Sequence, residues 1–208
     1  MSHTPAIPPR ERILAAADDL FRRFGIRGVG VETIAEAADT NKMTLYRHFE
    51  SKDALVAEWV RGVVSRKEAI WNDIAAQHVG DPGAQLIAWS KATAAKFAEI
   101  EERGSAIHNA IAELPATDHP ARVVIDQHRV KEHKQIAKLC REAGFPEPEL
   151  TADELSFLIE GAKSCVPSIG LKRVGENLVR IVSAMVAEHE STNARGRGGA
   201  RVKTGGKG

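Results

Sequence analysis

Apolar residues recur every three to four positions along most of this chain, which is the spacing of α-helices that bury one face. In the first such segment, residues 10–24, the stripe consists of Ile13, Leu14, Ala17, Leu20, Phe21 and Phe24, and Gly25 suits the helix end. The same pattern predicts further helices over residues 31–38, 42–49, 52–79, 84–100, 103–114, 120–143, 151–166 and 174–189. Strand-like alternation is absent, so we predict an all-α protein of about nine helices.

Local signals refine the ends of one late helix. Thr151 and Glu154 have the spacing of a capping box, in which a hydroxyl and a carboxylate satisfy free N–H groups at a helix start. Pro167 and Gly170 follow Val166 closely and are typical of a helix end. This helix is therefore expected to run from Thr151 to Val166.

Breaks in the pattern divide the chain into three parts. Residues 1–55 form an N-terminal head, and the helix over 52–79 links it to the rest of the chain. The turn Gly80-Asp81-Pro82-Gly83 is the candidate boundary of a second helical domain, residues 80–190. Residues 191–208 contain mostly Gly, Arg and Lys, with little to bury, and are expected to be a disordered basic tail.

Charge changes this picture only when it is divided by segment. The formal net charge is +1, but residues 1–68 carry +1, residues 69–190 carry −5 and the tail carries +5. A tail of this kind either adds salt-sensitive contacts to nucleic acid or is a solvated end. Composition alone leaves both open.

Several classes of protein are disfavoured. No apolar run reaches the length of a membrane span, and the start of the chain lacks the apolar stretch of a signal peptide. The two cysteines, Cys140 and Cys165, give neither a disulfide framework nor a Cys-based zinc site. None of the eight histidines has the Glu-x-x-His or His-x-x-x-His spacing of a helical metal site. We expect a cytoplasmic protein without a metal or other cofactor.

Residues 30–52 have the pattern of a helix-turn-helix. Ala35 is small where two helices would touch, Asp39 can adopt the left-handed backbone of the turn, and Leu45 is apolar where the second helix faces the first. Asn41 is a suitable N-cap for that second helix. With Leu45 and Phe49 facing inward, the rest of the second helix faces outward.

That outward surface suits a DNA duplex. Lys42 and Arg47 can neutralise phosphates, while Met43 and Thr44 can reach base edges in the major groove. The start of the preceding helix and the first turn of the following one offer flanking phosphate contacts. The predicted DNA-contacting residues are Thr33, Lys42, Met43, Thr44, Tyr46, Arg47, His48 and Lys52.

The stretch TIAEAADTNKMTLYRHFESKDAL resembles the DNA-binding signature of the TetR family of bacterial transcriptional regulators. The match covers Arg10 to Leu55, including L-Y-x-x-F and S-K-x-x-L blocks at the family's spacing. Departures are Asp39 for the family's Gly, Thr40 for Val, Asn41 for Ser, and Gly30 for a Ser or Thr cap. The resemblance implies a homodimer that binds a palindromic operator, most often as a repressor, and that releases it when a small-molecule effector binds in residues 80–190.

The resemblance also implies where two further sites lie. Helices that often line the effector cavity in this family carry Trp89, Phe97, His108, Ile111, His128 and Glu160. The last two main helices would build the dimer interface, with Leu158, Ala162, Cys165, Leu178, Val182 and Met185 as candidates. Apolar stripes of this kind are also typical of a core, and the sequence does not separate the two.

Two other functions fit an all-α chain. A helical ligand carrier or enzyme could use a pocket beyond Pro82, although no metal-ligand pair, nucleophile context or phosphate-binding loop is present in the sequence. Alternatively, the helix-turn-helix could be an adaptor surface that binds protein. The adaptor hypothesis predicts that duplex affinity does not depend on Lys42, Thr44 or Arg47.

Overall fold

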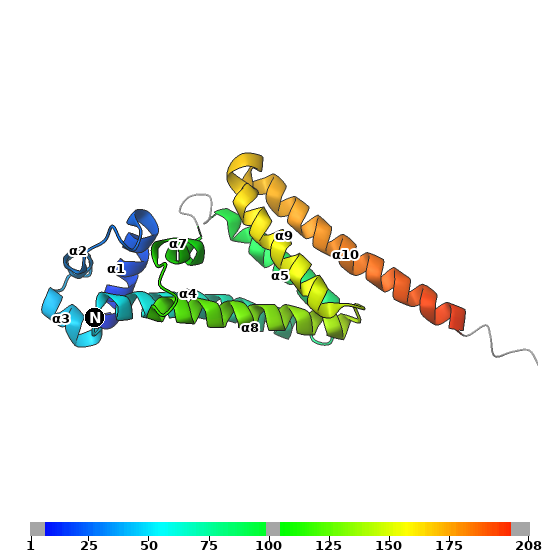
Figure 1. Ribbon diagram of the computed structural model, residues 1–208, viewed down its shortest axis with the longest axis horizontal. Helices are drawn as coiled ribbons and strands as arrows, with labels where there is room; N and C mark the ends of the chain where they lie inside the picture. Colours follow the sequence, from blue (N-terminus) through cyan, green and yellow to red (C-terminus); the bar gives the residue numbers. More distant parts are fainter. Residues whose placement is uncertain (1–6, 99–104, 201–208) are drawn as a thin grey trace, which may run out of the picture. The chain divides into compact units, whose positions relative to one another are not determined.

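The computed structural model describes residues 7–98 and 105–200, and within these ranges it contains nine α-helices and no strand. The helices are labelled in Figure 1. In chain order they are α1 (Pro9–Phe24), α2 (Val31–Ala37), α3 (Lys42–His48), α4 (Lys52–Gln77), α5 (Pro82–Ala95), α7 (Ala106–Glu113), α8 (Pro120–Ala143), α9 (Pro148–Ile169) and α10 (Leu171–Ala200). The all-α prediction is confirmed. The expected end of one helix at residue 100 and the expected start of the next at residue 103 lie outside the described ranges.

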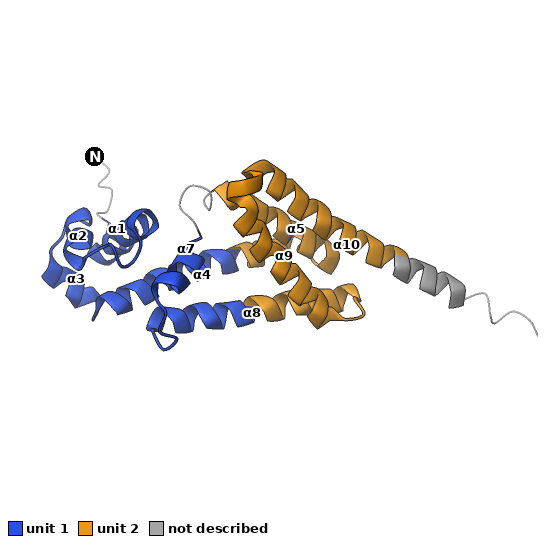
Figure 2. Ribbon diagram, turned by 45° about the horizontal axis from the view of Figure 1, so that its top comes forward, with its two compact units in different colours: residues 1–69, 102–131 blue, residues 70–101, 132–208 orange. Residues whose placement is uncertain are grey.

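The chain forms two compact units, coloured separately in Figure 2. The first comprises residues 1–69 and 102–131, and the second comprises residues 70–101 and 132–208. Helices α4 and α8 therefore contribute residues to both units. Each unit has its own hydrophobic core, so each is described separately.

The first unit is built around the apolar faces of α1, α2, α3 and the first half of α4. Ile13, Ile34, Leu45 and Leu55 come from these four helices in turn, and all four side chains are fully buried in one cluster. Burying a side chain of this size stabilises the fold by roughly 1.5–3 kcal/mol. Helices α1, α2 and α3 thus share a core with α4 that none of these three helices could form alone.

A polar contact at the edge of this core ties α1 to α4. The indole Nε1 of Trp59 donates to Oδ1 of Asp18 at 2.6 Å, and the Nε of Arg22 donates to the same carboxylate at 3.1 Å. The rings of Phe21 and Trp59 meet edge to face, with centroids 5.3 Å apart. Asp18 therefore orients the first helix on α4, which carries the head.

The turn between α2 and α3 has the backbone that the spacing predicts. Asp39 has φ +49°, and it is the only described residue other than glycine with a positive φ. Its N–H donates to the carbonyl of Glu36, and the N–H of Thr40 donates to the carbonyl of Ala35 at 2.9 Å. This pair of bonds is a Schellman motif, in which a left-handed residue lets the last carbonyls of a helix find donors. Asp39 therefore does here what glycine usually does.

The second unit packs α5, α9 and α10 against the end of α4 and the second half of α8. Leu86, Leu155 and Leu178 come from α5, α9 and α10, and each is almost completely buried in this core. Trp71 and Trp89 stack with centroids 5.3 Å apart and an interplanar angle of 23°. These contacts form a second core, independent of the first.

The predicted start of α9 was wrong. The helix begins at Pro148, with Glu147 at the N-cap position, so Thr151 already lies inside it. The hydroxyl of Thr151 donates to the carbonyl of Glu147 at 3.0 Å instead of capping free N–H groups. A proline at the first helical position costs no hydrogen bond, because that N–H has no partner inside the helix in any case.

The predicted ends of the last two helices were also wrong. Helix α9 passes through Pro167 and ends at Ile169, before Gly170 with φ +92°. A proline so close to the helix end removes little of the ladder, whereas glycine provides the left-handed stop. Helix α10 continues to Ala200, well into the tail that was expected to be disordered, because extending a helix that already exists avoids the cost of nucleation. Residues 201–208 lie outside the described part.

No described helix combines the length and the apolar character that crossing a bilayer requires.

Candidate nucleic-acid interface

The N-terminus of α3 is fixed by its own cap. Oδ1 of Asn41 accepts a hydrogen bond from the N–H of Thr44 at 2.8 Å. Leu45 and Phe49, one turn apart, are 0% and 5% exposed in the core of the first unit. Because these two residues face inward, the register of α3 determines which of its residues face solvent.

The structure places the predicted contact residues of α2 and α3 on the outside of the head. Met43 is 77% exposed and Tyr46 is 42% exposed, which is unusual for side chains of their size and apolar character. The remaining predicted residues on these helices are exposed or, for Thr44, half-buried; they are Thr33, Lys42, Thr44, Arg47 and His48. This surface presents cations, hydroxyls and an apolar tip together. Those groups suit the phosphates and base edges of a major groove.

Lys52 is placed differently from the other seven. It is half-buried, and its ammonium donates to the carbonyl of Ile26 at 2.6 Å. Its charge thus stabilises the loop between α1 and α2 through this hydrogen bond. An ammonium has three hydrogens, so this bond leaves donors for a phosphate.

Two basic groups near this surface, Lys42 and Arg12, are paired with carboxylates, which the sequence did not reveal. Nζ of Lys42 lies 2.5 Å from Oε1 of Glu32 in the first turn of α2. This hydrogen bond is the main reason that the pKa of Glu32 is lowered and that the pKa of Lys42 is raised. Arg12 reaches Asp39 at 3.3 Å. Neither pair has a helical i,i+4 spacing, so no local sequence pattern predicts either of them.

Arg10, a predicted flanking contact, is also engaged within the chain. Its guanidinium donates to Glu58 at 2.8 Å and lies over the ring of Phe49, 5.4 Å from the centroid. Among the cations of α3, by contrast, Arg47 has no ion pair with any described residue. Arg47 can therefore bind a phosphate without first breaking an ion pair to a described residue.

The six predicted effector-pocket residues are divided between the two units. Trp89, Phe97 and Glu160 lie in the second unit, where Trp89 and Phe97 are buried in its core. His108, Ile111 and His128 lie in the first unit, and Ile111 packs against its core. Burial of this kind shows that Trp89 and Phe97 stabilise the fold, whatever else they contact.

The predicted dimer residues occupy the α9–α10 part of the second unit. Leu178 and Val182 are 1% and 0% exposed within a single chain, so their side chains are already covered by its own helices. The others are half-buried at the edge of that core; they are Leu158, Ala162, Cys165 and Met185. The large apolar side chains that remain exposed on α9 are Leu150, at 51%, Phe157, at 74%, and Ile169, at 46%. Sequence periodicity missed Phe157 because it lies beside the apolar stripe rather than in it.

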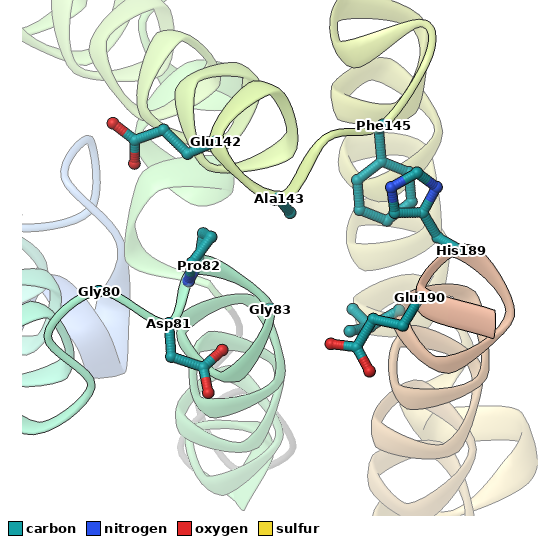
Figure 3. A pocket seen from close by; sticks show the side chains of 10 residues that line it. Gly80, Asp81, Pro82, Gly83, Glu142, Ala143, Phe145, His189 and Glu190 are labelled. Carbon is teal, nitrogen blue, oxygen red and sulfur yellow. The ribbon is translucent and has the colours of Figure 1, made fainter. Parts of the chain in front are cut away.

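A cleft of about 210 Å³ lies at the turn between α4 and α5 (Figure 3). Asp81, Glu142 and Glu190 line it, together with the ring of Phe145. That ring stacks on the imidazole of His189 with centroids 4.2 Å apart. None of the six predicted effector-pocket residues lines this cleft. Across the residues that the structure describes, no three His, Cys, Asp or Glu side chains are grouped closely enough to hold a metal ion.

Comparison with known proteins shows which family the head resembles. Residues 13–59 match the family model described as bacterial regulatory proteins, tetR family. An uncharacterized HTH-type transcriptional regulator of Mycobacterium tuberculosis is 42% identical over 50 residues, which are 24% of this chain and 25% of the relative. The HTH-type transcriptional repressor KstR2 of Rhodococcus jostii is 42% identical over 53 residues, 26% of each protein. The matches thus span about a quarter of the length of these curated relatives.

Solved structures extend the likeness in fold to most of the chain. The crystal structure of a TetR-family transcriptional regulator from Streptomyces coelicolor superposes with a TM-score of 0.80 and 24% sequence identity. The superposition covers 86% of this chain and 95% of that one. At this identity the likeness establishes a common fold.

Proposed function

The chain belongs to the TetR family of bacterial regulatory proteins, and we propose that it binds a specific DNA operator through α3 and thereby regulates transcription. The observation that carries this proposal is the outward face of α3, where Met43 and Tyr46 are exposed beside Arg47. Exposing apolar and aromatic side chains to water is unfavourable in free energy. In a complex with DNA, a thymine methyl or the sugar-phosphate backbone would cover them. Asn41 holds the helix start that would approach the bases.

The proposed regulator is a homodimer. Phe157 and Ile169 leave apolar area uncovered on α9 of the second unit, and a second copy of the chain would bury it. Two copies related by a two-fold axis would present two α3 helices to successive major grooves, about 34 Å apart. The operator is therefore expected to be palindromic.

We further propose that the protein is a repressor that a small-molecule effector releases from DNA. One relative, KstR2, is named a transcriptional repressor, and the helical second unit has a hydrophobic core of its own, separate from that of the head. An effector acts in this way if it favours a conformation that fits the operator less well. In this proposal the protein works in the bacterial cytoplasm, needs no cofactor and does no chemistry on its ligand.

Selection of genomic fragments by the purified protein tests the proposal most directly. Bound fragments should share a palindrome, and footprinting should protect it. Thr44→Ala and Tyr46→Ala should each weaken operator binding at least several-fold while leaving the dimer intact, because each removes a group facing the duplex. Thr93→Ala, on α5 of the second unit, is the matched control.

The same variants separate the proposal from its rivals. A protein-binding adaptor would bind no shared palindrome, and Thr44→Ala would leave its weak duplex affinity unchanged. A helical carrier or enzyme would likewise show duplex affinity that is independent of Thr44 and Tyr46. Either result would contradict the proposed function.

A further inference from the structure

The loop between α1 and α2 is held at a single peptide group from two sides. The carbonyl of Ile26 accepts a hydrogen bond from Nζ of Lys52, in the first turn of α4, at 2.6 Å. The N–H of Arg27 donates to Oε2 of Glu113, the last residue of α7, at 2.8 Å. The carbonyl of Ile26 and the N–H of Arg27 belong to the same peptide group. A cation therefore binds one side of this group and an anion binds the other.

The neighbouring residues show that the loop is shaped around this contact. Gly25 has φ +75°, and a Cβ placed on it would lie 2.9 Å from both carboxylate oxygens of Glu113. A Cβ on Gly28 would lie 2.5 Å from the carbonyl oxygen of Phe24. Only glycine fits at these two positions without displacement of the carboxylate or of the backbone.

The helix that delivers Glu113 is itself firmly placed in the first unit. Ala110, one turn earlier, is fully buried in the core of that unit. The carbonyl of Leu114, immediately after the helix, accepts a hydrogen bond from Arg122 at 2.9 Å. Glu113 thus reaches the loop from a helix that is anchored by a buried residue and by a side-chain hydrogen bond, which makes its carboxylate an effective constraint on the loop.

The clamped peptide lies directly before the DNA-facing elements. Gly30 is the N-cap of α2, and its carbonyl accepts the first helical bond, from Ile34 at 3.2 Å. Ile26, within the clamped peptide, and Val29, just before α2, are both buried in the head core. The position of this loop therefore sets where α2 begins and, through the turn at Asp39, where α3 lies.

We infer that Glu113 is a positioning residue for DNA binding, which acts with Lys52 by clamping the Ile26–Arg27 peptide. The charged partners polarise the peptide from both ends, and hydrogen bonds to ionised groups are stronger than those between neutral groups. Without the Glu113 carboxylate the loop would be held from one side only, by Lys52. The inference rests on the proposed DNA-binding function.

The test compares Glu113→Ala and Glu113→Gln with Asp126→Asn, which removes the same charge from an exposed position on α8 in the same unit. Operator affinity, amide hydrogen exchange at Arg27 and the melting temperature are measured on the full chain. Glu113→Ala should weaken operator binding about tenfold, a loss of about 1.4 kcal/mol, and should speed exchange at Arg27. Glu113→Gln keeps an acceptor oxygen, so it should stay within about threefold of the wild type.

Each outcome decides the inference. Rescue by glutamine supports positioning through the Arg27 N–H, whereas equal losses in both variants would contradict it. Operator binding by Glu113→Ala at the level of Asp126→Asn, or unchanged exchange at Arg27, would also overturn it. If Glu113→Ala does not fold, exchange at Arg27 in Glu113→Gln and Lys52→Met tests the clamp: faster exchange in Lys52→Met supports it, and unchanged exchange contradicts it. Failure of the wild type to bind any operator would contradict the proposed function alone, because exchange at Arg27 still reports the clamp without DNA.

Discussion

Nζ of Lys42, at the start of α3, lies 2.5 Å from Oε1 of Glu32, at the start of α2. Both side chains are more than half exposed, at 54% and 66%, so this ion pair stands on the surface that faces DNA in the proposed complex. A phosphate approaching Lys42 must compete with Glu32 or be repelled by it. The pair therefore lowers the attraction of the head for any duplex, whatever its sequence.

Replacing Glu32 should accordingly strengthen non-specific binding. Glu32→Gln frees the ammonium of Lys42 and removes a negative charge, so affinity for a duplex of unrelated sequence should rise about three- to tenfold at low salt. Titration of a labelled duplex at several salt concentrations measures both the affinity and its salt slope. Glu36→Gln, at an exposed position of the same helix without an ion pair to a described residue, is the control. Equal effects of the two variants would contradict a specific role for the pair.

Asp39 holds a left-handed backbone that glycine would adopt with less strain. Asp39→Gly should leave the free energy of unfolding unchanged or raise it by up to about 1 kcal/mol, whereas Asp39→Ala should lie about 1 kcal/mol below the glycine variant. The ion pair with Arg12 contributes little to the difference, because Asp39 is 98% exposed. Urea denaturation of the three proteins measures it. Equal stability of the glycine and alanine variants would show that the turn relaxes.

Glu58 should make part of the stability depend on acid pH. The hydrogen bond from Arg10 is the main cause that holds the pKa of Glu58 below its ordinary value of 4.5. A carboxyl with a lowered pKa contributes stability above its unfolded-state pKa and loses that contribution as the pH falls through the folded-state pKa. Wild type should therefore exceed Glu58→Gln by about 1 kcal/mol near pH 7, and the gap should close below pH 4.5. Urea denaturation from pH 7 to pH 3 checks this; a gap independent of pH would contradict it.

The two cysteines should differ in reactivity. Burial raises the pKa of the Cys140 thiol to about 11, so at neutral pH almost none of it is the nucleophilic thiolate. Cys165 is half-buried and more accessible. Iodoacetamide near pH 8 should therefore alkylate Cys140 only after unfolding in urea, whereas Cys165, a candidate residue of the proposed dimer interface, should react in folded protein diluted to the monomer. Mass spectrometry of the labelled peptides distinguishes the two, and rapid native labelling of Cys140 would contradict its burial.

Much of the fold followed from local pattern. The apolar period of α1, the Asn41 cap and the positive φ of Asp39 depend on residues within one or two turns of each other, and these predictions agree with the structure. The ends of α9 and α10 did not follow. At Pro148 and Pro167 two local signals compete, and which of them prevails depends on the hydrogen bonds and packing of the whole helix.

By itself, the sequence determined an all-α chain with a helix-turn-helix and the side of α3 that faces outward, because helical period relates neighbouring residues to one face. Only the tertiary structure decided which charges meet and which apolar residues are covered. Glu32 reaches Lys42, and Glu113 reaches Arg27, across separations that carry no repeating pattern. Leu178 and Val182 lie in a monomer core while Phe157 remains exposed, because burial depends on which helices pack together and not on the stripe alone.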